Sequence, residues 1–191
     1  VYDDADLEQS IKWAAFGIFF NKGEICTASS RIYVQDTIYD AFLKRFAEYV
    51  KSTFVQGDQF TEGVNVGPQI SKAQRDRILG YIKTGVKEGA RLLTGGSTPE
   101  NLADSKGYFL SPTILADCNQ QMRVVKEEIF GPVVTVSRFH TDEEAIKLSN
   151  DTNYGLAAYV FTKNLERSQK FITGVESGQV FVNITFAADY R

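Results

Sequence analysis

Short β-rich runs alternate with longer amphipathic segments along this chain, and this alternation limits the folds open to it more than any other feature. Extended runs are expected at residues 31–35, 92–94, 108–115, 133–139, 156–161 and 180–182. Helical periodicity fills much of the sequence between them. Strands separated by helices of this length favour an α/β layer fold, with a mostly parallel sheet flanked by helices and right-handed crossovers. We find no repeat or linker, so we expect residues 1–191 to form a single domain.

Capping and stop signals mark the expected helix ends. Acidic residues at positions 3, 4 and 6 open the first helix, and Asn21 and Gly23 end it. Asp36, Ser71 and Thr141 are expected to cap three later helices. A further helix is expected over 165–175.

Pro112 limits where the extended run at 108–115 can lie in a sheet. Proline has no N–H to donate to a strand ladder, and in sheets it is confined to edges, first positions and bulges. We therefore expect this run to be an edge strand or to carry a bulge.

Composition and charge argue against several classes of partner. Hydrophobic residues make up 43% of the chain, charged residues 24%, and the net charge is −3. We therefore expect no nucleic-acid partner and no membrane partner, and no apolar run is long enough to span a bilayer. The chain starts without Met or a signal-peptide pattern and has two distant cysteines, so we expect an internal piece of a cytoplasmic or other reducing intracellular protein.

Cys26 is the residue with the most chemical information. It follows an amphipathic helix, in a short loop of small and polar residues, which suits an accessible nucleophile. A free cysteine has a pKa of roughly 8.5, so a working thiolate needs a nearby base or positive field. Lys22 and Arg31 could supply that field and Glu24 opposes them, so from the residues alone a reactive thiol and a quiet packed one are equally open. Cys118 lacks such surroundings and is expected to be an inert loop cysteine.

The stretch around Cys26 resembles the active-site signature of the aldehyde dehydrogenase superfamily. Residues 19–31 read FFNKGEICTASSR, and Cys26 falls on the position of the family's catalytic cysteine. The segment KEEIFGPV at 126–133 is similar to the family's cofactor-ribose loop. Further similar segments lie at 67–69, 107–113, 153–158 and 178–183. Because their order and spacing hold along the whole chain, the resemblance is specific, and it implies the fold of the family's catalytic domain.

The resemblance implies that an aldehyde is oxidised to a carboxylic acid with NAD or NADP. Cys26 would attack the aldehyde carbon to form a thiohemiacetal, hydride would pass to the cofactor, and water would hydrolyse the thioester. The Cys26 backbone N–H could help to hold the oxyanion. Phe20, Ile25 and Thr27 would line the aldehyde tunnel.

The resemblance also implies cofactor contacts. Glu128 would accept hydrogen bonds from the nicotinamide ribose, and Phe130 would pack beside the nicotinamide ring. Gln74 and Arg77 would contact ribose or adenosine from the third helix, and Arg77 stands where better-known members carry Lys. Each has an ordinary alternative, as an exposed loop acid, a core aromatic or a solvated helix residue. We assign no metal ligand.

Several segments of the family are not found in this sequence. It has no Gly-x-Gly-x-x-Gly pattern, and the general-base segment Leu-Glu-x-Gly-Gly and the oxyanion asparagine would precede residue 1. A Pro-Phe-Gly-Gly segment and an oligomerisation strand would follow residues 187–191. We therefore expect 1–191 to be a catalytic domain truncated at both ends, without the cofactor-binding domain and the oligomerisation strand. We expect little or no turnover by the isolated chain and a homo-oligomeric parent protein.

Two other functions stay open at this stage. A cysteine hydrolase or acyltransferase would pair Cys26 with His140, the single histidine, for which no carboxylate partner is evident. A non-catalytic fragment would bind or pack against partner subunits. The sequence does not choose the aldehyde, the cofactor or the oligomeric state.

Overall fold

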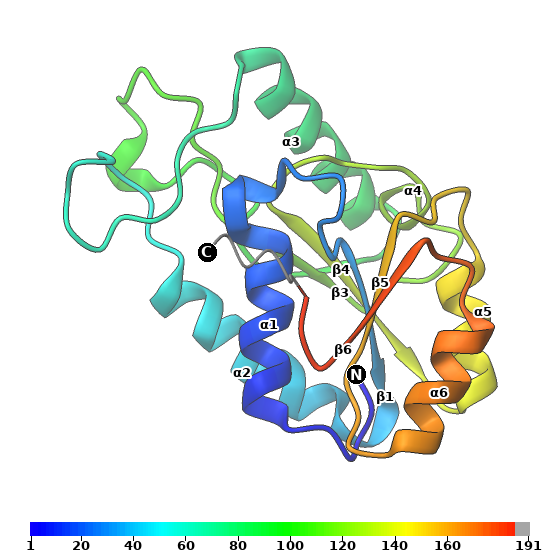
Figure 1. Ribbon diagram of the computed structural model, residues 1–191. Coiled ribbons are helices and arrows are strands. Elements are labelled where there is room, and N and C mark those ends of the chain that lie inside the picture. Colours follow the sequence, from blue (N-terminus) through cyan, green and yellow to red (C-terminus); the bar gives the residue numbers. More distant parts are fainter. Residues whose placement is uncertain (186–191) are drawn as a thin grey trace.

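The computed structural model describes residues 1–185 and contains a four-stranded sheet beside a two-stranded one (Figure 1). The larger sheet has the order β1-β4-β3-β2, with strands β1 (Arg31–Gln35), β2 (Arg91–Thr94), β3 (Thr113–Ala116) and β4 (Val133–Phe139). β1, β4 and β3 run parallel, and β2 is antiparallel to β3. The parallel strands β5 (Ala157–Val160) and β6 (Gln179–Val182) form the smaller sheet. The expected α/β fold with a mostly parallel sheet is confirmed. The expected oligomerisation strand, after residues 187–191, falls outside the described residues.

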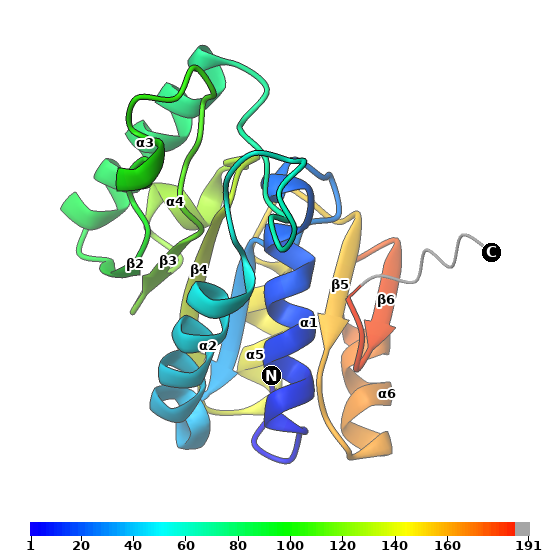
Figure 2. The same ribbon diagram turned by 90° about the vertical axis from the view of Figure 1, so that its left-hand side faces the viewer.

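Helices cover both faces of the larger sheet. They are α1 (Leu7–Phe19), α2 (Tyr39–Thr53), α3 (Lys72–Lys87), the short α4 (Arg123–Lys126), α5 (Asp142–Asn150) and α6 (Leu165–Gly174). Short 3₁₀ turns lie at η1 (Phe20–Gly23), η2 (Asp36–Ile38) and η3 (Glu100–Leu102). Figure 2 shows α1 and α2 in front of the sheet and α5 behind it. In the part of the chain that the structure describes, every helix is too short or too polar to cross a bilayer.

Alternating side chains of the central strands build a core on each face of the sheet. Val34, Ile114 and Val136 point into a core shared with α1 and α2. Leu115 and Val133 point to the other face, where α3 and α4 pack. This period of two follows from the pleat of a β-strand, and it explains why these strands are apolar at nearly every position. A third core joins α5, α6 and β5 and contains Tyr2, Phe139, Ala145, Val160 and Phe171.

The prediction that Asp36 caps the second helix was wrong. Asp36 begins η2, α2 starts only at Tyr39, and its N-cap residue Ile38 makes no side-chain capping bond. The Asp36 carboxylate instead lies 3.2 Å from Nδ1 of His140. The caps expected at Ser71 and Thr141 are confirmed, because each side chain accepts a backbone N–H three residues further on. Asp6, one of the acidic residues expected to open the first helix, caps α1 in the same way.

Of the extended run expected at 108–115, only the part from Thr113 is strand, and it is paired on both sides, so the edge alternative was wrong. β3 begins at Thr113, directly after the proline, and pairs with β4 on one side and β2 on the other. Pro112 therefore precedes the paired residues and removes no donor from the ladder. An irregularity in register does occur beside β3, between Leu92 and Thr94 of β2.

The first two residues join the two sheets at the carboxyl ends of β1 and β5. The Val1 amino group donates to the Tyr33 carbonyl (2.7 Å), and Gln35 N–H donates to the Val1 carbonyl (3.0 Å). Tyr2 N–H donates to the carbonyl of Phe161, which follows β5 (3.0 Å). These bonds hold β5 beside β1 at this end. The cavity between the two sheets is lined here by Val1, Tyr2 and Phe161 and extends to the loops that enter β1 and β4.

Removing the hydroxyl of Tyr39 should destabilise the larger sheet. Tyr39 is fully buried; its hydroxyl accepts from Asp117 N–H (2.9 Å) and lies 3.1 Å from the Val136 carbonyl. Tyr39→Phe leaves the Asp117 N–H without its acceptor and the Val136 carbonyl with the bond from Cys118 N–H (3.2 Å), so we expect the free energy of unfolding in urea to fall by about 1–3 kcal/mol. Tyr49→Phe is the control, because no hydrogen bond engages the Tyr49 hydroxyl within residues 1–185. Equal losses in the two variants would contradict this role of Tyr39.

Candidate active site

A tight left-handed turn delivers the chain from α1 to the loop that carries Cys26. Asn21, Lys22 and Gly23 have φ of 47°, 54° and 72°. Left-handed conformations cost non-glycine residues roughly 1–2 kcal/mol each, so this turn is held by its surroundings. The Asn21 side-chain amide donates to the Glu24 carbonyl (3.1 Å), which closes the turn. Cys26 follows directly and is exposed.

The turn at Gly23 packs against the backbone of the loop that precedes β4. A Cβ atom placed on Gly23 would lie 2.1 Å from the Gly131 carbonyl oxygen, so no larger residue fits here. Because β1 and β4 are parallel neighbours, the loops entering them meet at the same edge of the sheet. This contact brings the Cys26 loop beside the loop that carries Glu128 and Phe130.

The loop at 128–130 is held by donors from α3. Gln74 Nε2 donates to the Phe130 carbonyl (2.7 Å). Arg77 donates from Nη1 to the Ile129 carbonyl (2.6 Å) and from Nη2 to the Glu128 carbonyl (2.8 Å). Phe130 takes a left-handed φ of 57°, which these bonds help to maintain. Gln74 and Arg77 are not among the residues lining the adjacent cavity, and they engage the loop's backbone.

A second layer of charge supports the same loop. Tyr81 donates its hydroxyl to Glu127 (2.7 Å), and Arg123 Nε pairs with the other Glu127 oxygen (2.6 Å). The guanidinium groups of Arg77 and Arg123 lie 4.8 and 4.9 Å from the Tyr81 ring centroid. The bonds from Arg123 and Tyr81 lower the pKa of Glu127 to about 2, so this carboxylate stays ionised and buttresses the loop.

A cavity of about 540 Å³ lies between the two sheets and reaches the Cys26 loop. Cys26, Ile25, Thr27, Glu128 and Phe130 all line it. The Phe130 side chain is 39% exposed, and no hydrogen bond or ion pair within residues 1–185 engages the Glu128 carboxylate. A thiol, a carboxylate with unused acceptors and an aromatic face therefore share one hollow at the amino ends of β1 and β4.

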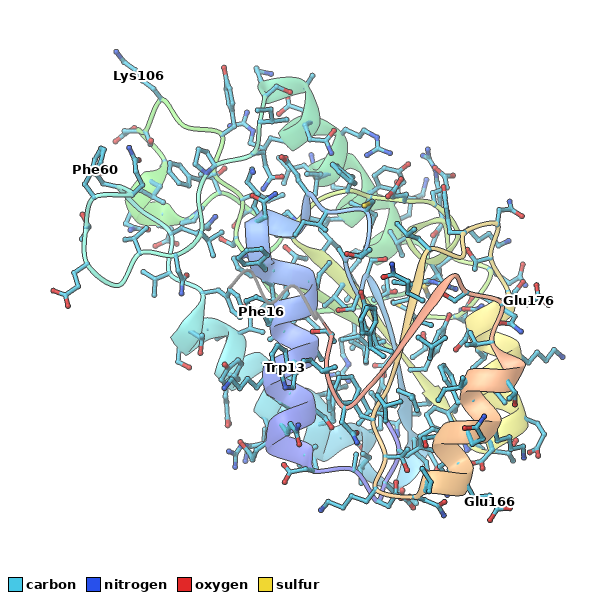
Figure 3. All side chains as sticks on the ribbon, viewed as in Figure 1. Trp13, Phe16, Phe60, Lys106, Glu166 and Glu176 are labelled. Carbon is cyan, nitrogen blue, oxygen red and sulfur yellow. The ribbon has the colours of Figure 1, made fainter. Side chains whose placement is uncertain are left out.

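Phe20 lies apart from that cavity. It borders a small hollow of about 10 Å³ together with Ile25 and Thr27, which line both spaces. The Phe20 ring is 46% exposed and stacks on Phe16 at a centroid distance of 4.8 Å. Figure 3 shows Phe16 and Trp13 along α1 on this side of the molecule. The three residues assigned to the aldehyde tunnel are therefore brought together, on the side of Cys26 that faces α1.

The cations near Cys26 in the sequence have other partners. Lys22 pairs with Glu24 (3.3 Å), and their side chains are 18% and 9% exposed. Glu24 also accepts from Ile70 N–H (3.2 Å), which ties the turn to the segment before α3. Arg31 donates to the Tyr33 hydroxyl (3.1 Å) and the Ser149 carbonyl (3.2 Å). Lys22, Glu24 and Arg31 therefore stabilise the backbone around the turn. The sequence alone had instead suggested Lys22 and Arg31 as a source of positive field at Cys26.

His140 lies far from Cys26. Arg31 pairs with Thr135 at the start of β1, and Gln35 pairs with Phe139 at its end. Cys26 precedes the first pair and His140 follows the second, so roughly 13 Å of strand separates them. His140 therefore cannot act as the base for Cys26, although Asp36 does supply it with a carboxylate neighbour.

Cys118 has the inert setting that its sequence context predicts. It is buried at 7% exposure, and its Sγ lies 3.3 Å from the Leu115 carbonyl oxygen. Burial raises the pKa of the Cys118 thiol to about 12. Cys26 is the exposed thiol and Cys118 the buried one.

Tyr159 is a site residue that sequence reasoning missed. It lies on β5, lines the cavity and donates its hydroxyl to the Thr27 carbonyl at 2.5 Å. Nothing in the local sequence connects it to Cys26, because the contact spans 132 residues of chain. Only the placement of β5 across the cavity brings the two together.

Comparisons with known proteins agree in family and fold. The model of the "Aldehyde dehydrogenase family" matches residues 1–190. An aldehyde dehydrogenase-like protein of Schizosaccharomyces pombe is 51% identical over 191 residues, which is 100% of this chain and 38% of that protein. "Aldehyde dehydrogenase [NAD(P)+] 2" of Saccharomyces cerevisiae is 46% identical over 188 residues, 97% of this chain and 37% of that protein. A crystal structure of betaine aldehyde dehydrogenase from Staphylococcus aureus, in complex with NAD+ and with a BME-modified cysteine, superposes with a TM-score of 0.93 at 39% identity. It covers 97% of this chain, which spans 38% of that one.

Substituting Gly23 should separate the two loops of the site. Gly23→Ala places a methyl group against the Gly131 carbonyl, whereas Gly63→Ala meets nothing within 4 Å. Both glycines have positive φ, of 72° and 85°, so Gly63→Ala controls for backbone strain alone. We expect Gly23→Ala to lower the free energy of unfolding by about 1–3 kcal/mol more than Gly63→Ala does. Equal effects in urea titrations would show that the loops do not meet at this point.

Proposed function

This chain belongs to the aldehyde dehydrogenase family, and from that premise we propose that it is the cysteine-bearing catalytic part of a longer enzyme that oxidises an aldehyde to a carboxylic acid with NAD or NADP. The chain spans 38% of the length of its Schizosaccharomyces pombe relative, so the activity is proposed for the whole protein. The observation that carries the proposal is the cavity shared by Cys26, Glu128 and Phe130.

Cys26 is the proposed nucleophile. Its sulfur attacks the aldehyde carbon, the carbonyl π electrons move to oxygen, and a thiohemiacetal forms. Among the described residues, none accepts a hydrogen bond from the Cys26 backbone N–H, so this donor is free to stabilise the oxyanion. Once loss of hydride to bound cofactor had converted the thiohemiacetal to a thioester, water would attack the thioester carbon, the C–S bond would break, and the carboxylic acid and the free thiol would form.

The other cavity residues fit a nicotinamide cofactor. The unengaged Glu128 carboxylate can accept bonds from two ribose hydroxyls, and the exposed Phe130 ring offers a flat apolar surface for a planar ring. Bound NAD(P) would accept the hydride that converts the thiohemiacetal to a thioester. Gln74 and Arg77 hold the Glu128 loop in place through their bonds to its carbonyls, and we keep their direct contact with cofactor as a prediction.

The relatives support the cofactor class and an aldehyde substrate. The Staphylococcus aureus structure is a complex with NAD+, and the Saccharomyces cerevisiae relative is named for NAD(P)+. The modified cysteine in the former shows that a thiol in that fold is open to small reagents. Phe20, Ile25 and Thr27, which border the hollow beside Cys26, are proposed to guide the aldehyde. We also propose a homo-oligomeric parent protein in a reducing intracellular compartment.

The rival functions receive less support. A cysteine hydrolase would need a base, and His140 lies at the other end of the sheet from Cys26. A non-catalytic fragment would have no need of an exposed thiol beside an unengaged carboxylate. We propose that the 191-residue chain alone forms no more than traces of acid, because the family's general-base segment is not in it.

Cys26 should react with iodoacetamide much faster than Cys118. Cys26 is exposed, whereas burial raises the pKa of Cys118 to about 12, so Cys118 stays a thiol at pH 8 and is shielded from the reagent. We expect mass spectrometry of the folded chain to show a single adduct on Cys26, with the second appearing only in denaturant. Cys118→Ser should keep the fast adduct and Cys26→Ser should lose it. Labelling of Cys118 at the same rate would argue against Cys26 as the nucleophile.

In the whole protein, Cys26→Ser should abolish aldehyde-dependent NAD(P)H formation. A neutral hydroxyl is a far weaker nucleophile than a thiolate, so we expect kcat/KM to fall by about a thousandfold or more. Glu128→Gln should mainly raise KM for NAD(P), because it weakens an acceptor for the ribose. His140→Asn is the control and should leave kcat unchanged. Full activity of Cys26→Ser would rule out the mechanism, and an esterase activity that His140→Asn abolishes would favour the hydrolase.

A further inference from the structure

We propose that Tyr159 is a positioning residue for the nucleophile, whose hydroxyl fixes the turn that carries Cys26. This inference rests on the proposed function of Cys26. Tyr159 is on β5, in the smaller sheet, while Cys26 lies between α1 and β1. Within residues 1–185, the bond from the Tyr159 hydroxyl to the Thr27 carbonyl is the one hydrogen bond from β5 or β6 to the loop 24–30.

Cys26 occupies a closed turn. Ala28 N–H donates to the Ile25 carbonyl at 3.1 Å, so Cys26 and Thr27 are the two central residues of a four-residue turn. The peptide group between Thr27 and Ala28 is therefore held at both polar atoms. Its N–H is bonded to Ile25, and its carbonyl is bonded to Tyr159 at 2.5 Å. Because both polar atoms of this peptide group are bonded, it resists rotation, and the backbone of the turn, which directs the Cα–Cβ bond of Cys26, is held with it.

The Tyr159 hydroxyl is itself held in place. Its ring stacks on Phe181 of β6 at a centroid distance of 5.5 Å and an interplanar angle of 18°. Both rings belong to paired strands, since Tyr159 and Phe181 are partners in the register of β5 and β6. A tyrosine needs only two torsion angles to be fixed, so this donor is ordered at low entropic cost.

The environment keeps the hydroxyl protonated and able to donate. Burial raises the pKa of Tyr159, and negative charge on the nearby Cys26 sulfur raises it further. A tyrosine is protonated at neutral pH even with its ordinary pKa of about 10, so the hydroxyl can donate to the Thr27 carbonyl there.

The placement of the turn has a direct chemical consequence. Carbonyl attack requires the sulfur within about 3–3.5 Å of the carbon and aligned with it, and a displacement of about 1 Å can cost a hundredfold in rate. The turn also directs the Cys26 N–H, the proposed oxyanion donor. Without the Tyr159 hydroxyl, the Thr27 carbonyl loses its hydrogen-bond donor and one end of the peptide group becomes free. We then expect both the Cys26 sulfur and the Cys26 N–H to sample a wider range of orientations.

The test compares Tyr159→Phe with Tyr154→Phe. Phenylalanine keeps the stack on Phe181 and removes only the hydroxyl. Tyr154 lines the same cavity, is 56% exposed, and has no side-chain hydrogen bond within the described residues, so it is a matched control. In the 191-residue chain we expect hydrogen exchange at Ala28 N–H to be about tenfold faster in Tyr159→Phe and unchanged in Tyr154→Phe. In the whole protein we expect kcat to fall about tenfold while KM for NAD(P) stays within about twofold.

Each outcome bears on one proposal. Unchanged exchange at Ala28 and unchanged kcat in Tyr159→Phe would overturn the positioning role, as would an equal loss in Tyr154→Phe. A parallel rise in KM for NAD(P) would also overturn it, because it would mean general damage to the cavity. If the wild-type whole protein oxidises no aldehyde, the proposed function fails, and the exchange rates still decide whether Tyr159 holds the turn.

Discussion

The parallel pairing of β1 with β4 is the constraint on which the rest of the site depends. It places the loops that enter these strands at one edge of the sheet, where the Gly23 backbone meets the Gly131 carbonyl. Neither loop is regular structure, and each is held by polar side chains from α3 or from the turn itself. Cys26 and Glu128 line the same cavity because the backbones of their two loops are in contact at Gly23 and Gly131.

This arrangement uses the amino ends of the strands. Open α/β sheets commonly bind ligands beyond the carboxyl ends, where loops and helix N-termini converge. Here Cys26 precedes β1, and Glu128 and Phe130 precede β4, while the carboxyl ends of β1 and β5 are joined through Val1 and Tyr2. The left-handed residues Asn21, Lys22 and Phe130 lie in these loops. Backbone strain of this kind is typical of functional sites, where surrounding bonds maintain it.

Much of the fold could be read from local patterns. Helix caps at Ser71 and Thr141 and the apolar strand 133–139 were predicted correctly, because capping bonds and strand burial act within a few residues. The errors at Asp36 and Pro112 share one cause. Asp36 suits either a helix cap or the start of a 3₁₀ turn, and Pro112 suits either an edge strand or the position before an inner strand. In each case contacts with distant residues determined which structure forms. Asp36 begins a 3₁₀ turn and lies beside His140, so it does not cap α2. Pairing of β3 begins at Thr113, so the missing N–H of Pro112 costs the sheet no hydrogen bond.

The sequence alone determined which chemical groups are present and which segments resemble the family: a thiol after a helix, a carboxylate and a phenyl ring before a strand, and the order of those segments. Tertiary structure alone decided which groups meet. Lys22 pairs with the Glu24 carboxylate, and Arg31 donates to the Ser149 carbonyl. His140 lies at the opposite end of the sheet from Cys26, and Tyr159 bonds to Thr27, which is 132 residues away in the sequence. The reason is physical: the preferences of a residue act over a few neighbours, whereas a hydrogen bond between two sheets exists only after strand order and register have placed its donor within about 3 Å of its acceptor.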